Sequence, residues 1–397
     1  MVSKNQPDKV VQTSSNNLRT LIIGGGIAGL TLAALMEQRE ENPLVIEKVD
    51  SFDELGYMLG LYPLGARVLQ GLGLYDRYLE ESVTMKRYAI HRGDGSLVKD
   101  YDLSEVNERF GPIQGITRGA LVRLLLDKVG TSRVRTGVTT QQINQSGEVV
   151  HVDFSDGSSG EYDLVVAADG MHSATRKMLC DESSYEYKST GWGGWVFWAD
   201  PSLSDLHRYK EFWGAGHFVG LYPAGKKLGV FIGGPVNEID NIGMKGFIDQ
   251  IHSTAGQQSP LIDTLLSRLE FNEAPYFWKF HDVRLQNWRK GRVVFLGDAA
   301  AGFLPTAGVG ASMAMESAAA LNDELSRTTP ERVEQALDLY IQRHQERVFT
   351  AQDSSRQLGQ MMLLESPTLS WGRNKLLNFY TVEQLVKDIA DLMDQPI

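Results

Sequence analysis

The chain has 397 residues, enough to bury a large core and more than one compact domain usually contains. Its 39 lysine and arginine residues stand against 50 aspartate and glutamate residues, and the net charge is −11 with no basic block, which argues against nucleic acid as the main partner. Cys180 is the only cysteine, which excludes an internal disulfide and a cysteine-based metal site and predicts a reducing, cytoplasmic location.

The first 17 residues are polar and lack the apolar stretch of a secretory signal, so they are predicted to form a disordered tail. The longest apolar run, Leu21–Met36, is interrupted by glycines and is explained as a strand, a turn and a helix. No membrane span is therefore expected.

Residues 19–47 read as a strand–turn–helix–strand unit. The elements are a buried strand at Leu21–Ile23, a G-x-G-x-x-G turn made by Gly24, Gly26 and Gly29, a helix over Ala28–Glu41, and a second strand at Val45–Ile46 followed by Glu47. This order predicts a parallel sheet and a site for a dinucleotide.

Each residue of the turn has a physical task in such a site. Gly24 permits the tight turn, Gly29 permits close packing of helix and strand, and the absence of a side chain at Gly26 leaves room for a diphosphate on the helix N-terminus. Glu47 would accept hydrogen bonds from ribose hydroxyls. A ligand-free crossover is the alternative, but it accounts for neither Gly26 nor Glu47.

The next elements are predicted from local patterns. They are a glycine-rich loop over Gly56–Leu74 that enters a helix near Pro63, a hairpin over Lys86–Tyr101, an amphipathic helix over Ile116–Val129 with Arg118 at its start, and a hairpin-like pair of Val149–Phe154 with Leu164–Ala168.

Residues 183–283 are rich in aromatic side chains and strand-like runs, and only Ile242–Leu269 looks helical. This segment predicts a second, mainly antiparallel sheet. A buried strand at Arg292–Leu296, a small-residue helix at Ala311–Ser326, a long helix at Pro330–Gln360 and a less regular tail follow.

Three buried strands end in glycine or aspartate turns: Gly24–Gly29, Asp169–Gly170 and Gly297–Asp298. Ligands of open α/β sheets bind outside the carboxyl ends of the strands, so the three turns are predicted to converge on one elongated dinucleotide. Helix capping is the alternative role for both aspartates.

With these motifs in this order, the chain resembles the class A flavoprotein aromatic hydroxylases, the FAD monooxygenases similar to para-hydroxybenzoate hydroxylase. The resemblance covers about residues 18–360. It rests on GGGIAG with Glu47-Lys48, on DLVVAADG over 163–170, on GRVVFLGDAA over 291–300 followed by Pro305 and Gly308–Gly310, and on Arg118. The chain departs from the family pattern at Met58, Leu64, Ala301, Ala307, Val309 and Ser312, which makes the loop near the flavin less polar.

The resemblance implies FAD as cofactor, NAD(P)H as co-substrate and molecular oxygen as the second substrate. The residues expected at the cofactor are Gly24, Gly26, Ala28, Gly29, Glu47, Lys48, Arg118, Asp169, Gly297, Asp298, Pro305, Gly308, Val309, Gly310 and Ala311. From the residues themselves, the helix after Gly308 would stabilise negative charge on reduced flavin through its N-terminal partial charge.

A substrate pocket is expected beside the aromatic run GWGGWVFWAD over 191–200, where one face of the strand would cover a flat apolar molecule. The expected pocket residues are Trp195, Phe197, His217 and Tyr222. Core packing is the alternative for each aromatic residue, and a structural role is the alternative for the histidine. No metal-ligand spacing is present, and no protein nucleophile is required.

The expected fold is therefore α/β: a Rossmann-like FAD-binding domain that is discontinuous in sequence, a mainly antiparallel substrate domain and C-terminal helices. The expected bounds are 18–80, 104–182 and 284–328 for the first, 81–103 and 183–283 for the second, and 329–397 for the helices.

The expected function is a single-component monooxygenase in which NAD(P)H reduces FAD and a flavin hydroperoxide hydroxylates or epoxidises an apolar, aromatic or polycyclic small molecule. Two alternatives stay open: an FAD-linked dehydrogenase or saturase, and a non-flavin nicotinamide-binding or redox-sensing protein. The pattern does not determine the oligomeric state.

Overall fold

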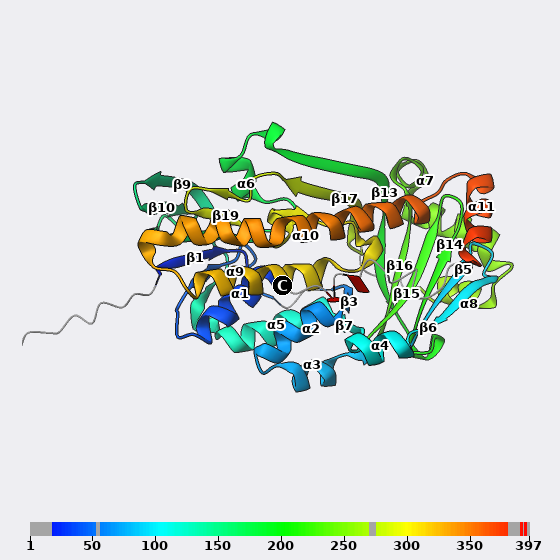
Figure 1. Cartoon of the computed structure of the whole chain (residues 1–397). Helices are drawn as coiled ribbons and strands as arrows, with labels where there is room; N and C mark the ends of the chain where they lie inside the picture. Colours follow the sequence, from blue (N-terminus) through cyan, green and yellow to red (C-terminus); the bar gives the residue numbers. More distant parts are fainter. Residues whose placement is uncertain (1–17, 53–55, 270–274, 380–389, 392, 395–397) are drawn as a thin grey trace, which may run out of the picture.

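The computed structural model describes residues 18–52, 56–269, 275–379, 390–391 and 393–394, so the predicted tail at 1–17 lies outside the described residues. At one end of the molecule lies a mainly parallel sheet with its helices, and at the other a large antiparallel sheet (Figure 1). The expected α/β fold with a second, mainly antiparallel sheet is confirmed.

The first sheet has six strands in the order β18-β19-β12-β1-β2-β8. Their bounds are β1 Thr20–Ile23, β2 Leu44–Ile46, β8 Val134–Arg135, β12 Leu164–Ala167, β18 Arg289–Lys290 and β19 Val293–Phe295. All pairs are parallel except that of β18 with β19. Because β1, β12 and β19 are neighbours, the turns that follow them meet at one edge of the sheet.

The helices around this sheet form a layered core. Their bounds are α1 Ile27–Glu37, α2 Pro63–Gly71, α3 Tyr75–Glu81, α4 Ser104–Phe110, α5 Arg118–Val129, α6 Ala174–Leu179, α9 Gly310–Leu325 and α10 Val333–Met362. The small-residue helix α9 packs against α1, α2 and α10. The long helix α10 runs along both halves of the molecule (Figure 1).

The second sheet has eight strands in the order β20-β17-β13-β16-β15-β14-β5-β6. Their bounds are β5 Arg87–Arg92, β6 Leu97–Asp102, β13 Tyr185–Ala199, β14 Arg208–Trp213, β15 Phe218–Ala224, β16 Lys227–Pro235, β17 Phe277–Leu285 and β20 Ala301–Gly302. Only β14 and β5 pair in parallel. The predicted hairpin over residues 86–101 is confirmed by β5 and β6.

Helices α7 (Val236–Ile251) and α8 (Pro260–Ser267) pack on one face of this sheet, and the other face turns toward the first half of the molecule. A small sheet of β3 (Met58–Leu61), β7 (Gln114–Thr117) and β4 (Val83–Thr84) lies against β15 and joins the two halves. The domain bounds expected from the sequence remain a prediction.

Several local predictions were wrong in their details. The strand Val149–Phe154 (β10) pairs with β9 (Thr140–Ser146) and β11 (Ser159–Tyr162), whereas Leu164–Ala167 belongs to the parallel sheet. The loop at residues 56–62 contains β3, and the tail contains the helix α11 (Pro367–Leu377). Pairing with distant strands decided the outcome for β3 and Leu164–Ala167, and α11 packs against β6; local patterns report neither kind of contact.

Candidate functional site

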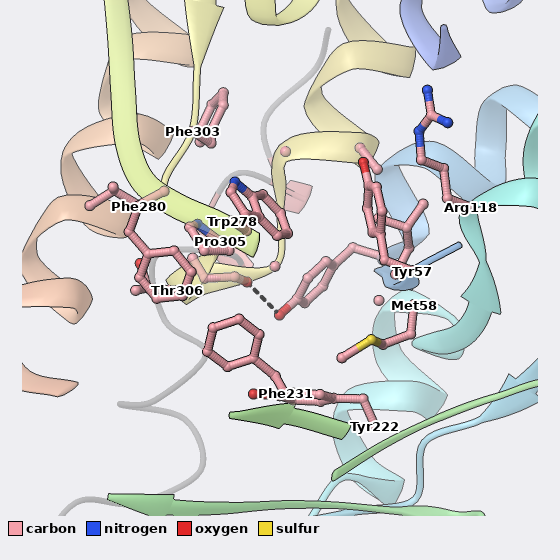
Figure 2. Close-up of a pocket in the computed structure, with 18 of the residues that line it drawn as sticks. Tyr57, Met58, Arg118, Tyr222, Phe231, Trp278, Phe280, Phe303, Pro305 and Thr306 are labelled. Atoms are coloured by element: carbon pink, nitrogen blue, oxygen red, sulfur yellow. Dashed lines mark hydrogen bonds between the residues drawn. The ribbon is translucent and has the colours of Figure 1, made fainter. Parts of the chain in front are cut away.

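A cavity with a volume of about 380 Å³ lies where the two halves meet. Its lining comes from the turn after β1, the loop before α9, the helix start at Arg118 and the inner face of the eight-stranded sheet. Arg118 and Tyr57 lie on one side of this space, and Phe231 and Tyr222 lie on the other (Figure 2).

The three glycines of the first turn differ in what the protein itself requires of them. A Cβ atom at Gly24 would lie 2.3 Å from the Ala168 carbonyl oxygen, and one at Gly29 would lie 2.1 Å from the Gly24 carbonyl oxygen. At Gly26, however, φ is −81° and no atom lies within 4 Å of a Cβ position. Neither backbone strain nor packing therefore explains Gly26, whereas a ligand at this helix start does.

The start of α1 has the features of an anion site. Gly26 is its N-cap and makes no side-chain capping bond, and the first turn carries no acidic residue. Gly26, Ile27 and Ala28 all line the cavity. Free backbone N–H groups and the helix dipole at this point favour a diphosphate, so the residues present fit the predicted dinucleotide.

Glu47 and Lys48 follow β2 and do not line the cavity. One Glu47 carboxylate oxygen accepts from the Gly25 backbone N–H at 2.7 Å, and the other accepts from the Val49 N–H at 3.1 Å. Glu47 thus holds the glycine turn against the end of β2, and Lys48 is exposed beside it. Contact of either residue with a cofactor remains a prediction.

Arg118 opens α5 and lines the cavity. Its backbone N–H donates to the Tyr57 carbonyl at 2.8 Å, and its guanidinium lies 5.7 Å from the Tyr57 ring centroid. The segment that precedes β3 therefore fixes the arginine, with its charge directed at the same space as Asp298.

Asp298 follows β19 and is half-buried on the cavity wall, next to Gly297, which has a φ of +59°. A Cβ at Gly297 would lie 2.7 Å from the Cβ of Ala28, which brings this turn against α1. Burial raises the pKa of the Asp298 carboxyl to about 6, and the positive charges of Arg118 and Arg176 act in the opposite direction. No hydrogen bond to its carboxylate occurs among the described residues, so a ligand hydroxyl would find a free acceptor.

We expect Asp298→Asn to stabilise the FAD-free protein while weakening its binding of FAD. Because the folded state holds this proton more tightly than the unfolded chain, wild-type stability falls as the pH rises from about 4 through about 6. The variant should therefore gain about 1–3 kcal/mol in free energy of unfolding near pH 8, and less at lower pH. Urea unfolding at several pH values measures this gain, and a gain independent of pH would contradict the assignment.

Asp169 follows β12, but its hydrogen bonds fit the capping alternative. One oxygen accepts from the Ser173 hydroxyl at 2.6 Å and the other from the Thr175 N–H at 2.9 Å, at the start of α6. Its neighbours Ala168 and Gly170 line the cavity, whereas Asp169 does not. These two hydrogen bonds do not support a direct contact between the Asp169 side chain and a cofactor, which therefore remains a prediction.

The loop before α9 supplies a second open helix start. Pro305, Gly308, Gly310 and Ala311 line the cavity, and α9 has no side-chain cap. Gly308 has a φ of +64°, a conformation that favours glycine. The side chain of Val309 is buried in the core instead, so only its backbone could meet a ligand.

The apolar part of the cavity is built by the inner face of the eight-stranded sheet and by α10. Its lining includes Met85, Leu103, Ile113, Val196, Phe218, Phe231, Trp278, Phe280, Leu304, Leu358 and Met362. The prediction that Trp195 and Phe197 line the pocket was wrong: both pack in the core formed with α7 and α8, on the opposite face of β13. Because side chains alternate along a strand, Val196 lies on the cavity side.

Of the two polar pocket residues expected, Tyr222 lines the cavity and His217 does not. His217 packs against Gly93 and Gly214 in the turn after β14, where burial lowers its pKa. The sequence interpretation missed Tyr88, Tyr209 and Glu211, which lie in the cavity wall. An acidic residue that alternates with aromatic ones, as in YKEFW over 209–213, was the available signal.

No three His, Cys, Asp or Glu side chains in the described ranges are grouped so that they could hold a metal ion. Within the same part of the chain, no helix has the length and apolar character needed to cross a bilayer.

The sequence matches the family described as FAD binding domain over residues 17–355. Similar proteins include a flavin-dependent monooxygenase of Legionella longbeachae serogroup 1 (27% identical over 78% of this chain and 81% of the relative) and the 3-amino-4-hydroxybenzoate 2-monooxygenase of Streptomyces cremeus (29%, over 77% and 78%). The 2-heptyl-3-hydroxy-4(1H)-quinolone synthase of Pseudomonas aeruginosa is 26% identical over 91% of this chain and 94% of the relative.

Solved structures share the fold over nearly the whole chain. HpxO of Klebsiella pneumoniae complexed with FAD and uric acid superposes with a TM-score of 0.84 at 24% identity and covers 95% of this chain and 96% of that one. The 2-methyl-3-hydroxypyridine-5-carboxylic acid oxygenase has a TM-score of 0.77 at 20% identity, with 96% and 99% covered.

Proposed function

The chain belongs to the FAD-binding family of flavin-dependent monooxygenases, and on this basis we propose that it oxygenates a flat, largely apolar aromatic small molecule with NAD(P)H as the reductant. The main support for this proposal is that a single cavity extends from Gly26 and Asp298 to Phe231 and Trp278. A dinucleotide site and an apolar pocket therefore open into each other.

The residues that would hold FAD follow from the contacts already described. The open start of α1 at Gly26 would receive the diphosphate, Asp298 would accept from a ribityl hydroxyl, and the loop Pro305–Gly310 would lie along the flavin ring. Bound FAD supplies the redox chemistry: it accepts reducing equivalents from NAD(P)H and activates molecular oxygen for transfer to the substrate. Family membership sets aside the non-flavin alternative.

The protein itself would position the substrate, shield the site from water and stabilise negative charge on the reduced flavin. The start of α9 carries roughly half a positive elementary charge and would stabilise negative charge on a reduced ring beside Gly308. Phe231, Trp278 and Phe280 would hold the substrate within about 3–3.5 Å of the reacting atom. The same apolar wall excludes water, which protects activated oxygen from loss as peroxide.

The character of the substrate is inferred from the wall and from the relatives. Ten aromatic side chains line the cavity, and the Phe231 and Phe280 rings stack at 5.2 Å between centroids. Relatives are named for 3-amino-4-hydroxybenzoate and for a heptyl quinolone, and HpxO is complexed with uric acid. A planar ring system fits both this lining and these names.

The test is product mass. FAD-loaded protein is incubated with NADH or NADPH, ¹⁸O₂ and a panel of aromatic compounds, and both cofactor oxidation and product mass are followed. We expect at least one compound to accelerate NAD(P)H oxidation and to gain one labelled oxygen atom. A product that changes only in hydrogen content would instead support the dehydrogenase or saturase alternative.

A further inference from the structure

A buried carboxylate lies in the otherwise apolar part of the cavity wall. Glu211 stands on the inner face of β14, between Tyr209 and Trp213 on the same face, and is only 6% exposed. The mechanism described above does not use it. A carboxylate in such surroundings is costly unless hydrogen bonds compensate for the lost water, so its presence needs an explanation.

Three neutral donors converge on Glu211. The Tyr88 hydroxyl and the Trp213 indole N–H donate to its Oε2 at 2.5 and 2.8 Å, and the Tyr222 hydroxyl donates to its Oε1 at 2.7 Å. These donors come from three neighbouring strands, β5, β14 and β15. The pairing of these three strands in the sheet therefore brings the cluster together.

Gly220 makes this arrangement possible. It pairs with Glu211 across β14 and β15, and a Cβ atom at position 220 would lie 2.3 Å from the Tyr222 ring. Without a side chain there, the Tyr222 ring can lie over the strand and bring its hydroxyl to the carboxylate. Tyr222 in turn contacts Tyr209 edge-to-face, with ring centroids 5.3 Å apart.

The cluster has acceptor capacity left over. An ionised carboxylate accepts about four hydrogen bonds, and Glu211 receives three, with one on Oε1 and two on Oε2. Tyr88 and Tyr222 donate their protons to Glu211, so their oxygens also remain acceptors. The Tyr209 hydroxyl, in the same wall, is buried without a hydrogen-bond partner among the described residues. The Tyr209 hydroxyl can donate or accept, and the free acceptor site on Glu211 can take a hydrogen bond from a donor group in the cavity.

We propose that Glu211, held by Tyr88 and Tyr222, orients the substrate by accepting a hydrogen bond from an N–H or O–H group on an otherwise apolar ring system. This inference rests on the proposed function, because it takes the other end of the cavity as the FAD site. It adds to that function a specificity rule: the donor group is held at the sheet, and the remaining ring packs against Phe231 and Phe280.

The test compares two probes of nearly equal shape. 2-Naphthol carries an O–H donor, and 2-methoxynaphthalene carries only an acceptor and is more apolar. Dissociation constants are measured on FAD-loaded protein, without NAD(P)H, from the change in flavin absorbance. Because an unmatched buried acceptor is costly, wild-type protein should bind the naphthol at least about tenfold more tightly, against the order of apolarity.

Glu211→Gln should reduce this preference to about onefold. A glutamine oxygen cannot accept from all three donors, and its NH₂ group presents a donor to the cavity. The matched control is Glu324→Gln, which removes a buried carboxylate outside the cavity lining and should keep the preference, because its partner Arg343 retains its ion pair with Asp323. Tyr222→Phe keeps the carboxylate and frees one more acceptor site, so it too should keep or increase the preference, and it replaces Glu211→Gln if that variant does not fold.

The outcomes separate the two proposals. The role of Glu211 would be overturned if wild-type protein bound both probes equally or did not bind 2-naphthol. It would also be overturned if Glu211→Gln kept the preference for 2-naphthol or if Tyr222→Phe lost it. None of these results would affect the oxygenation test. Failure of the protein to oxygenate any compound would instead count against the proposed function, because the binding assay needs no turnover.

Discussion

Replacing Gly26 with valine is expected to remove bound FAD and to leave the fold of the protein intact. Gly26 has an ordinary φ of −81° and open space where a Cβ would stand, so the protein itself tolerates the substitution. The new side chain would stand where the diphosphate meets the backbone N–H groups of α1. We expect the affinity for FAD to fall at least about a hundredfold, or about 2.8 kcal/mol.

Flavin content of the purified protein and titration of the FAD-free protein with FAD measure this loss. Thermal unfolding of the FAD-free protein should change little, because valine at an N-cap that lacked a capping side chain costs less than about 1 kcal/mol. Gly71→Val is the matched control: it alters an exposed glycine that has equally open surroundings and does not line the cavity, and it should retain FAD. Full flavin content in Gly26→Val would contradict the diphosphate assignment.

Replacing Glu316 with alanine is expected to cause the largest loss of stability among single side-chain changes in α9. The Glu316 carboxylate accepts from the Arg347 guanidinium at 2.6 and 3.2 Å, and both side chains are buried between α9 and α10. Removing one partner leaves the arginine charge without its carboxylate in the core. The free energy of unfolding should therefore fall by about 3–5 kcal/mol, as urea unfolding would show.

The double variant Glu316→Leu with Arg347→Met is the control for this prediction. Two apolar side chains of similar size remove both charges together, so most of the lost stability should return. If the double variant is as unstable as Glu316→Ala, the loss comes from packing and the buried charge is not its cause.

The meeting of the strand-end turns at one cavity could be predicted because its signals are local. The task of each glycine in the first turn depends on neighbours a few residues away, and parallel strands place their carboxyl ends at one edge of the sheet. Gly26 and Asp298 accordingly line the same cavity. Asp169 shows the limit of such local prediction, because a residue that ends a strand can equally cap the next helix. The hydrogen bonds of Asp169 fit this capping role.

The substrate half could not be predicted in the same way. Alternation along β13 separates Trp195 and Phe197 from Val196, but both faces of this strand are apolar, so the pattern cannot tell which one meets the cavity. Helices α7 and α8 cover the first face, and that contact is made by segments about 40 to 70 residues further along the chain.

The sequence by itself determined the family, the α/β fold class and the meeting of the glycine turns at one cavity, because short motifs carry the turns, helix starts and strand ends that build them. Only the tertiary structure decided the opposite wall of that cavity. Tyr88, Glu211 and Tyr222 come together through the pairing of β5, β14 and β15, and no local pattern encodes that meeting. Backbone near a few turns builds one end of the cavity, whereas side chains from strands that are distant in sequence build the other.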